Sequence, residues 1–287
     1  MIEEGLQYCS LRCGQLLLSS VSAELIFLRS RPFTQVVTVN AELFVLAHNN
    51  EVLRHITSTS VNTIDGRVLQ LICRLIYPGS EIRRVVGADL IYELASHCQK
   101  NRQKVFLLGS TQKANKCAIG ALQKQFPGIQ VSGFAPPWRA DQLDHSRNEC
   151  ILEVIQDARP EHLVVCFGPM VQETWIHRNS ARLQELGVRC AYGLGGTIDV
   201  VAGLRRRAPR WVQFIGAEWL FRLICDPRGR FSRTLRMFKM PLYAALTKRE
   251  IHAQFGGELL PSLPGQGRDR GNQDGSGVGR IVDGASS

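Results

Sequence analysis

The sequence predicts an α/β fold with a mainly parallel β-sheet and flanking helices. Over residues 104–196, short apolar runs alternate with helical patterns, which is typical of βαβ units. Several of the apolar runs end in turns of small residues, as strands do at the ligand-binding edge of such sheets. At 287 residues with 44% hydrophobic content, the chain has the composition of an ordinary globular protein.

The first half of the chain contains two strand signals. Val36–Val39 is a β-branched run that ends at Asn40, and a helical spacing follows over Ala41–His55. Val105–Thr111 is the stronger signal, because an apolar run meets a small-residue turn and the helical pattern Ala114–Phe126 begins directly after it. Both regions therefore predict a strand followed by a helix.

The second half continues this alternation. Residues Ile129–Gly133 predict a strand, Arg147–Ala158 a helix and His162–Phe167 the next strand. The pattern Glu173–Leu186 then predicts a helix, and Val188–Tyr192 predicts a further strand. The order of these elements favours right-handed crossovers and parallel neighbours.

Three small-residue turns are expected to surround one crevice. They are Gly109-Ser110, Gly168-Pro169 and Gly193–Gly196, and each follows an expected strand. Ligands of open α/β sheets bind at the carboxyl ends of the strands. The run Gly193–Gly196 differs from the G-x-G-x-x-G spacing of dinucleotide-binding loops and comes late in the domain, so a phosphate-approaching or tightly packed turn fits it better.

The N-terminal segment and the cysteines narrow the class of protein. Residues 1–32 form a weakly patterned lead-in, and Leu16–Leu28 is interrupted by serines and a glutamate, so neither a signal peptide nor a membrane span is expected. Nine scattered cysteines without a Cys-x-x-Cys pair indicate reduced thiols in a cytoplasmic protein. No metal-binding motif is visible, so no metal and no cofactor are expected. Residues 253–287, which are rich in Gly, Asp and Ser, predict a disordered tail.

The positive charge is concentrated in one segment. Residues 201–250 contain twelve Lys or Arg against three Asp or Glu, while the whole chain has a net charge of +10. Trp211, Trp219, Phe221 and Leu223 alternate with these arginines. A basic segment with aromatic side chains suits an anionic partner, which is a lipid surface, a diphosphate or a nucleic acid.

Polar residues at strand ends have two interpretations each. Thr38 and Asn40 lie on one face of the first strand and either cap a turn or contact a ligand. Asp65, in an Asp-Gly pair, is either a turn residue or a general base. Gln172 and Glu173 open a helix after Gly168-Pro169, where an anion site or simple N-terminal capping by Glu173 is expected.

Together these segments resemble the WecG/TagA/CpsF family of bacterial inverting glycosyltransferases. The resemblance spans residues 33–240 and rests on the series of motifs in order rather than on a single one. The matching segments are Val37–Glu42, Asp65-Gly66, Arg84–Leu90, Val105–Ser110, Phe167–Glu173, Gly195–Gly203, Arg207–Trp211 and Gly216–Leu223.

The resemblance implies transfer of a sugar from a UDP-sugar donor to a polyprenyl-diphosphate-linked acceptor. It implies a Rossmann-like catalytic core, placed at residues 33–203, and a helical C-terminal appendage, placed at residues 204–252. The resemblance further implies that the appendage docks on an anionic membrane surface and helps to close the active site. The protein is then expected to be cytoplasmic and peripherally attached to the inner face of the cell membrane, in the synthesis of a cell-surface polysaccharide or teichoic acid.

The resemblance also assigns roles to residues. Asp65 is the expected general base, and Arg67 places a cation beside it that either lowers its pKa or binds an acidic sugar. The expected substrate-binding residues are Thr38, Asn40, Arg84, Gly109, Gln172 and Asp199. The arginines expected to contact the diphosphate or the membrane are Arg207, Arg210, Arg222 and Arg228.

Two other classes of protein stay open at this stage. A nucleotide-cofactor oxidoreductase is suggested by Gly193–Gly196, although the first strand ends in Thr38-Val39-Asn40 rather than in a glycine loop. A nucleic-acid binder is suggested by the arginines alone, and no nucleic-acid-binding module accompanies them, so no nucleic-acid partner is expected. The donor sugar, the acceptor and homo-oligomer formation are left open.

Overall fold

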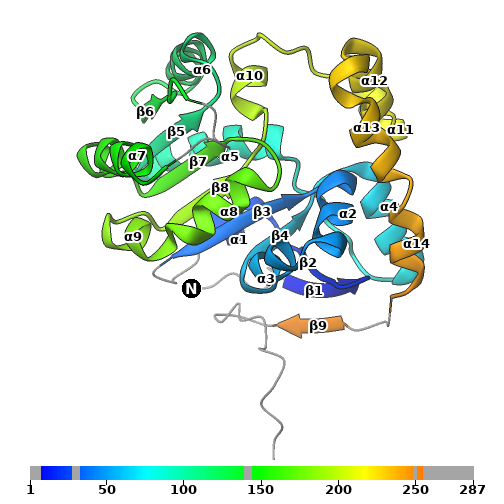
Figure 1. Cartoon of the computed structure of the whole chain (residues 1–287). Helices are drawn as coiled ribbons and strands as arrows, with labels where there is room; N and C mark the ends of the chain where they lie inside the picture. Colours follow the sequence, from blue (N-terminus) through cyan, green and yellow to red (C-terminus); the bar gives the residue numbers. More distant parts are fainter. Residues whose placement is uncertain (1–7, 28–32, 139–143, 248–250, 255–287) are drawn as a thin grey trace, which may run out of the picture.

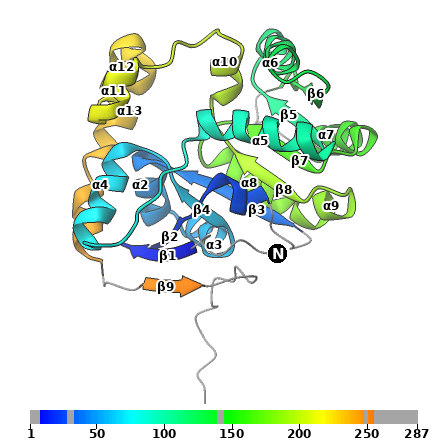
Figure 2. The same cartoon turned by 180° about the vertical axis from the view of Figure 1, so that it is seen from behind.

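The computed structural model describes residues 8–27, 33–138, 144–247 and 251–254. Within them the chain forms one sheet with helices on both faces (Figures 1 and 2). The strand order is β6-β5-β7-β8-β3-β4-β2-β1-β9, and the pairs from β6 to β2 are parallel. The predicted α/β fold with a mainly parallel sheet is confirmed.

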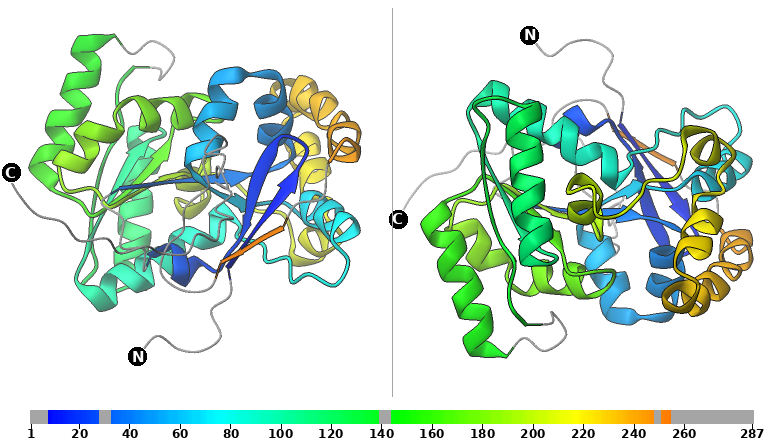
Figure 3. Two further views of the ribbon diagram at one scale, coloured as in Figure 1. Left: turned by 90° about the horizontal axis from the view of Figure 1, so that it is seen from below. Right: turned by 90° about the horizontal axis from the view of Figure 1, so that it is seen from above.

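The strands lie close to the ranges predicted for the core. The strands are β1 Tyr8–Cys13, β2 Leu16–Ser20, β3 Thr34–Val39, β4 Val61–Ile64, β5 Lys104–Gly109, β6 Gln130–Phe134, β7 His162–Cys166, β8 Cys190–Gly193 and β9 Ile251–Gln254. Strand β1 pairs antiparallel with both β2 and β9. This antiparallel group forms one edge of the sheet (Figure 3).

The helices follow the strands as βαβ units require. They are α1 Ala23–Phe27, α2 Ala41–Asn49, α3 Glu51–Thr59, α4 Arg67–Ile76, α5 Gly87–Asn101, α6 Gln112–Gln125, α7 His145–Ala158, α8 Val171–Arg178, α9 Ser180–Glu185, α10 Thr197–Val201, α11 Arg210–Ile215, α12 Glu218–Cys225, α13 Pro227–Met237 and α14 Met240–Ala245. Helices α1, α5, α6 and α10 share one apolar cluster with the sheet, and α7, α8 and α9 share another.

The central strands are buried on both faces because alternate side chains enter different apolar clusters. In β5, Val105 and Leu107 pack toward α5 and α6, whereas Phe106 and Leu108 pack toward α7. In β3, Val36 joins the first of these clusters and Val37 joins a third one with α2 and α4. These positions are completely buried, so the strands that carry the site are fixed by the core.

Two expected helices are each divided in two by an asparagine. The range Ala41–His55 is split at Asn50, whose side-chain oxygen accepts a hydrogen bond from the Leu53 amide and caps α3. The range Glu173–Leu186 is split at Asn179, between α8 and α9. Asparagine competes for backbone hydrogen bonds, so it favours helix ends over helix interiors.

The N-terminal strands β1 and β2 belong to the sheet. This differs from the weakly patterned lead-in that was expected for residues 1–32. Strand β2 pairs parallel with β4 through Ser19 and Thr63, and α1 packs against α5. Ser19 and Ser20, two of the serines that interrupt the apolar pattern here, are buried. The lead-in therefore extends the sheet beyond the core.

The C-terminal helices α11–α14 lie beside α2 and α4 (Figure 1), with α13 and α14 against α2 and α11 against α4. Met240 and Ala244 of α14 are buried in the cluster formed with β1, β2, α2 and α4. Strand β9 then pairs with β1 and ends at Gln254. The first two residues of the expected tail, 253 and 254, therefore lie in a strand. Residues 255–287, the rest of that tail, lie outside the described residues. In the part that is described, the helices are too short or too polar to span a bilayer.

Candidate active site

The carboxyl ends of five parallel strands surround a cavity of about 290 Å³. The strand ends contribute one wall, and the segment from the end of α10 into α12 contributes the other. The lining residues from the strand ends include Thr38, Asn40, Asp65, Ser110, Gly168, Pro169, Gln172 and Gly195, and those from the other wall include Asp199, Arg205, Arg206, Arg207, Glu218 and Arg222. The three small-residue turns do meet at one crevice, as predicted.

A second cavity, of about 110 Å³, lies beside the first. Its walls come from the start of α4, from Arg84 in the segment before α5, and from α11–α13, which contribute Gln213, Trp219, Thr234 and Met237. The residues common to both cavities are Asn40, Glu42, Asp65, Glu218 and Arg222. Asp65 therefore stands where the two cavities meet.

Asp65 is held at this junction by the end of β4. Its amide donates a hydrogen bond to the Val39 carbonyl at 2.9 Å, which places it beside the end of β3. Burial raises the pKa of Asp65 to about 6, while Arg222 and Arg84 oppose the rise and Glu218 adds to it. The carboxyl group can exchange a proton near neutral pH, which suits a general base.

Arg67 does not have the effect on Asp65 that the sequence suggested. Its Nη1 donates to Gln70 Oε1 at 2.9 Å, and its guanidinium lies over the Phe214 ring, 5.7 Å from the centroid. The expected lowering of the Asp65 pKa is wrong, because burial dominates and the pKa rises. Arg67 instead lines the smaller cavity and connects α4 to α11.

Thr38 and Asn40 line the large cavity and also make the capping contacts considered from the sequence. Thr38 Oγ1 donates to the Gly193 carbonyl at 2.9 Å, and Asn40 Oδ1 accepts from the Leu43 amide at 3.0 Å. Asn40 thus caps α2, while its position in both cavities keeps it available to a ligand. Their roles as substrate contacts stay predictions.

Gln172 and Glu173 are both buried in the wall of the large cavity. Gln172 Oε1 accepts from the Gly195 amide at 3.0 Å, and Glu173 Oε2 accepts from the Met170 amide at 2.6 Å. The alternative of N-terminal capping by Glu173 is therefore what the structure shows. Burial raises the pKa of Glu173 to about 7, and its hydrogen bonds oppose that rise.

The loop after β5 places Ser110, rather than Gly109, in the cavity. Gly109 has a φ of 107°, and an added Cβ would lie 2.8 Å from the Cys166 carbonyl oxygen, so glycine is needed for close packing between β5 and β7. Ser110 Oγ donates to Asp199 Oδ1, and Arg205 Nη2 lies 3.7 Å from Asp199 Oδ2. Asp199 is in the cavity as predicted; Ser110 and Arg205 were missing from the predicted site residues.

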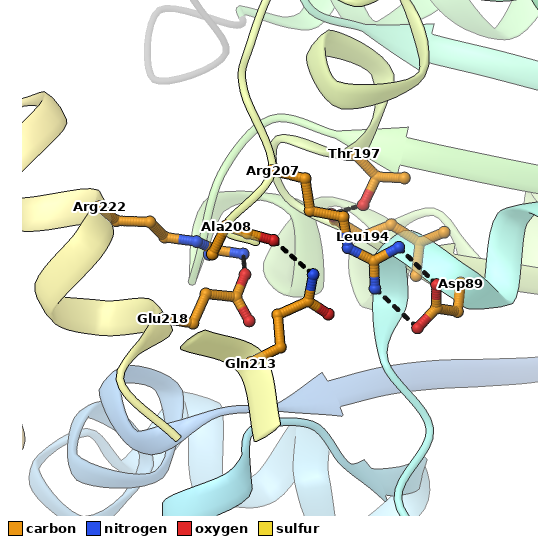
Figure 4. A network of polar contacts seen from close by, with 8 residues as sticks. All are labelled: Asp89, Leu194, Thr197, Arg207, Ala208, Gln213, Glu218 and Arg222. Carbon is orange, nitrogen blue, oxygen red and sulfur yellow. Dashed lines mark hydrogen bonds and ion pairs between the residues drawn. The ribbon is translucent and has the colours of Figure 1, made fainter. Parts of the chain in front are cut away.

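The predicted arginines fall in different places. Arg207 forms a two-pronged ion pair with Asp89 at 2.6 and 2.7 Å, and Arg222 pairs with Glu218 (Figure 4). Arg84 lines only the smaller cavity, and no ion-pair partner is found for it among the described residues. Arg228 is exposed on α13 and lines neither cavity, and Arg210 begins α11.

The segment between α10 and α11 carries two arginines, Arg205 and Arg206, that were not among the predicted site residues, next to Arg207, which was. The run Arg205-Arg206-Arg207 lines the large cavity, and Arg206 is exposed within it. Figure 4 shows how Arg207 reaches across to Asp89 while Gln213 donates to the Ala208 carbonyl at 2.6 Å. Across the described ranges, no three His, Cys, Asp or Glu side chains are placed to hold a metal ion together.

Comparisons with known proteins agree with this geometry. A family model described as the glycosyl transferase WecG/TagA/CpsF family matches residues 15–254. The chain is similar to N-acetylglucosaminyldiphosphoundecaprenol N-acetyl-beta-D-mannosaminyltransferases of three bacteria. In Bacillus subtilis the identity is 28%, with 75% of this chain and 79% of the relative covered; in Bacillus spizizenii it is 26%, with 82% and 85%; in Staphylococcus aureus it is 29%, with 75% and 81%.

Proposed function

Because the chain belongs to the WecG/TagA/CpsF family of glycosyltransferases, we propose that it transfers a sugar from a UDP-sugar to a polyprenyl-diphosphate-linked acceptor. The observation that carries the proposal is the position of Asp65 at the junction of two cavities. The names of the relatives contain an undecaprenyl-diphosphate-linked N-acetylglucosamine and an N-acetylmannosaminyl group, so these are the first substrates to test. The comparisons give the oxidoreductase alternative no support, and the Gly195 amide already bonds to Gln172.

The large cavity suits the donor, and the smaller one suits the acceptor. The large cavity has the volume for a bound sugar nucleotide to enter in part, and Arg205 and Arg206 supply positive charge on its far wall. The smaller cavity is lined by the appendage residues Trp219 and Met237 and by Arg84, whose positive charge acts on Asp65 in the same cavity. Apolar side chains of the appendage beside the guanidinium of Arg84 suit a sugar joined to a lipid diphosphate.

The proposed reaction is a single displacement with inversion at the anomeric carbon. Asp65 accepts the proton of the acceptor hydroxyl as that oxygen forms a bond to the anomeric carbon of the donor. The bond between the anomeric carbon and the diphosphate oxygen breaks, and UDP leaves with the electron pair. Attack from the smaller cavity on a donor held in the larger one places the nucleophile opposite the leaving group. The arginines of the cavity walls balance the negative charge that develops on UDP.

The exposed face of the appendage supports attachment to an anionic membrane. Its large apolar side chains are exposed: Trp211, Phe214, Ile215, Leu220, Ile224, Phe231, Leu235, Phe238, Leu242 and Leu246. Apolar side chains on short helices with many arginines fit the interface of an anionic bilayer. Of the four residues predicted for this role, Trp211 is exposed at 68%, whereas Trp219 packs edge-on against Phe238. We propose that this face holds the smaller cavity next to the lipid acceptor at the cytoplasmic face of the membrane.

The decisive experiment is a transfer assay with purified full-length protein. It uses a panel of UDP-sugars, beginning with UDP-N-acetylmannosamine, and an undecaprenyl-diphosphate N-acetylglucosamine analogue. The expected result is UDP release that requires the acceptor, with a product whose anomeric configuration by NMR is opposite to that of the donor. UDP release without acceptor dependence, or no release with any donor of the panel, would contradict the proposal.

A further inference from the structure

A buried carboxylate in the wall of the large cavity has no role in the chemistry described above. Glu173 is 1% exposed and Gln172, its neighbour on α8, is 4% exposed. Within the described part of the chain, Glu173 has no ion-pair partner. A buried carboxylate without a cation destabilises the fold unless several hydrogen bonds stabilise its charge. The hydrogen-bond partners of Glu173 therefore indicate its role.

The hydrogen bonds of these two side chains converge on the Glu173 carboxyl group. The Gly195 amide donates to Gln172 Oε1 at 3.0 Å, Gln172 Nε2 donates to Glu173 Oε1 at 2.7 Å, and the Met170 amide donates to Glu173 Oε2 at 2.6 Å. Backbone amides can only donate, so Gln172 must turn its oxygen to Gly195 and its nitrogen to Glu173. Glu173 then faces two donors, one on each oxygen of its carboxyl group.

This relay ties together the loops that follow β7 and β8 and joins them to the neighbouring strand β3. It holds Met170 after β7 and Gly195 after β8, and the Glu173 carbonyl accepts from Gln35 Nε2 of β3 at 2.9 Å. Packing around it is tight, because a Cβ added to Gly193 would lie 2.9 Å from Glu173 Oε1 and 3.0 Å from Gln172 Nε2.

Both backbone donors belong to loops in an unusual conformation. Met170 has a φ of 72° and Gly195 a φ of 59°, which is the left-handed region. A non-glycine residue such as Met170 keeps this conformation only where its surroundings hold it. Gly168, Pro169, Gly195 and Gly196 of these loops line the large cavity.

We propose that Glu173 is a positioning residue for glycosyl transfer: through Gln172 it fixes the loops after β7 and β8 that form the donor side of the large cavity. The assignment of that cavity to the donor rests on the proposed function. Glu173 itself acts through Met170 and Gly195 rather than on the reacting atoms. Its loss should therefore weaken donor binding more than it slows the chemical step.

The test is a pair of substitutions that break and then restore the relay. Glu173→Gln keeps the shape of the side chain but leaves one acceptor for two donors, so either Met170 or Gln172 loses its partner. The double variant Gln172→Glu with Glu173→Gln moves the carboxylate one residue and again satisfies every donor. Glu185→Gln, which removes a charge from the exposed Arg182–Glu185 pair on α9, is the matched control.

Two readouts separate this inference from the proposed function. Hydrogen exchange of peptides covering residues 168–174 and 193–199 measures the opening of the two loops. This measurement does not depend on whether the proposed substrates are correct. We expect Glu173→Gln to speed exchange in both peptides and to raise the donor KM about tenfold with kcat nearly unchanged, and we expect the double variant to restore both.

Three outcomes would overturn the inference. They are unchanged exchange and KM in Glu173→Gln, a fall in kcat at unchanged KM, and a double variant as impaired as the single one. If the wild-type protein transfers no sugar at all, the proposed function fails and the donor role of the loops falls with it. The exchange data alone then decide whether Glu173 holds the loops.

Discussion

The two walls of the large cavity are built on different principles. The wall formed by the strand ends consists of side chains that are buried and bonded to the backbone, such as Thr38, Gln172 and Glu173. The wall formed by the segment before α11 and by α12 carries arginines that remain partly exposed, and its outer face exposes large apolar side chains. The first wall is complete in the isolated chain, whereas the second has an outer face suited to a partner.

The difference suggests that the strand-end wall holds reacting groups in position, whereas the appendage wall recruits a surface or a ligand. Buried, fully bonded polar groups resist displacement, because each one moved loses hydrogen bonds that water cannot replace. Exposed helices with few buried contacts respond more readily to a surface or a ligand. Substitutions that change only a few atoms at the strand ends should therefore alter the reaction rate. The behaviour of the appendage should depend on whether a membrane or a ligand is present.

The largest expected effect comes from the strand-end wall. Asp65→Asn removes the proposed base while keeping the shape of the side chain, and we expect kcat to fall by about 10²- to 10⁴-fold. The folded protein should gain stability at neutral pH, because burial disfavours the charged form and raises the pKa of Asp65. Steady-state kinetics and thermal unfolding measure the two effects.

A control for this variant lies close to it in the same cavity. Glu42→Gln changes a second cavity carboxylate that has not been assigned to the chemistry. Its kcat should fall far less than that of Asp65→Asn. If folded Asp65→Asn protein has the kcat of the wild type, Asp65 is not the general base. The proposed difference in function between the two walls would then also be wrong.

The strand-end wall was also the part that the sequence predicted best. Parallel strands bring their carboxyl ends to one edge, so Thr38, Asp65 and Gln172 could be placed together from their positions after apolar runs. The direction of the Asp65 pKa shift could not be read in this way. It depends on burial and on Arg222, which is far away in the sequence.

The parts that were missed depend on contacts between distant segments. Strand β2 was hidden because its serines break the apolar pattern; Ser20 Oγ donates to the Glu81 carbonyl and accepts from the Arg83 amide, both at 2.8 Å. The pairing of Arg207 with Asp89 joins residues 118 positions apart. Neither contact leaves a local signal in the sequence.

The pH dependence of the reaction gives the next largest effect. Asp65 acts as a base only when ionised, and its pKa is raised to about 6, so it loses activity as the pH falls through about 6. The value of kcat/KM, which reports the ionisation of the free enzyme, should fall about tenfold per pH unit below about 6. A flat kcat/KM from pH 7 to 5 would show that Asp65 does not accept the proton.

Membrane binding tests the opposite wall. Trp211 is 68% and Ile224 is 72% exposed on the appendage, and replacing both by serine removes apolar area that would enter the bilayer. We expect vesicle partitioning to fall about tenfold or more for each residue, while kcat with a short water-soluble acceptor stays close to that of the wild type. Val52→Ser, at a site 55% exposed on α3, is the matched control.

Sedimentation with anionic and with neutral vesicles gives the measurement. Anionic vesicles should bind the wild-type protein more strongly, because arginines accompany the apolar side chains. If the double serine variant sediments like the wild type, the exposed face of the appendage serves something other than a membrane. The Val52→Ser control should bind as the wild type does.

The smallest effect concerns the contact that joins the two walls. Arg207 and Asp89 form a half-exposed ion pair between the segment before α11 and the start of α5. Asp89→Asn should raise the donor KM about two- to fivefold, the size expected for such a pair. Arg207→Gln should have a similar effect, and the two changes together should cost little more than either alone.

This double-mutant cycle also decides between the two roles of Arg207. As a partner of Asp89, it holds the arginine-bearing segment over the cavity, and the two substitutions are then coupled. As a diphosphate contact, which the family resemblance implies, it would lose far more activity in Arg207→Gln than in Asp89→Asn, and the losses would add. The geometry favours the first result, because both prongs of the guanidinium already bind the Asp89 carboxylate.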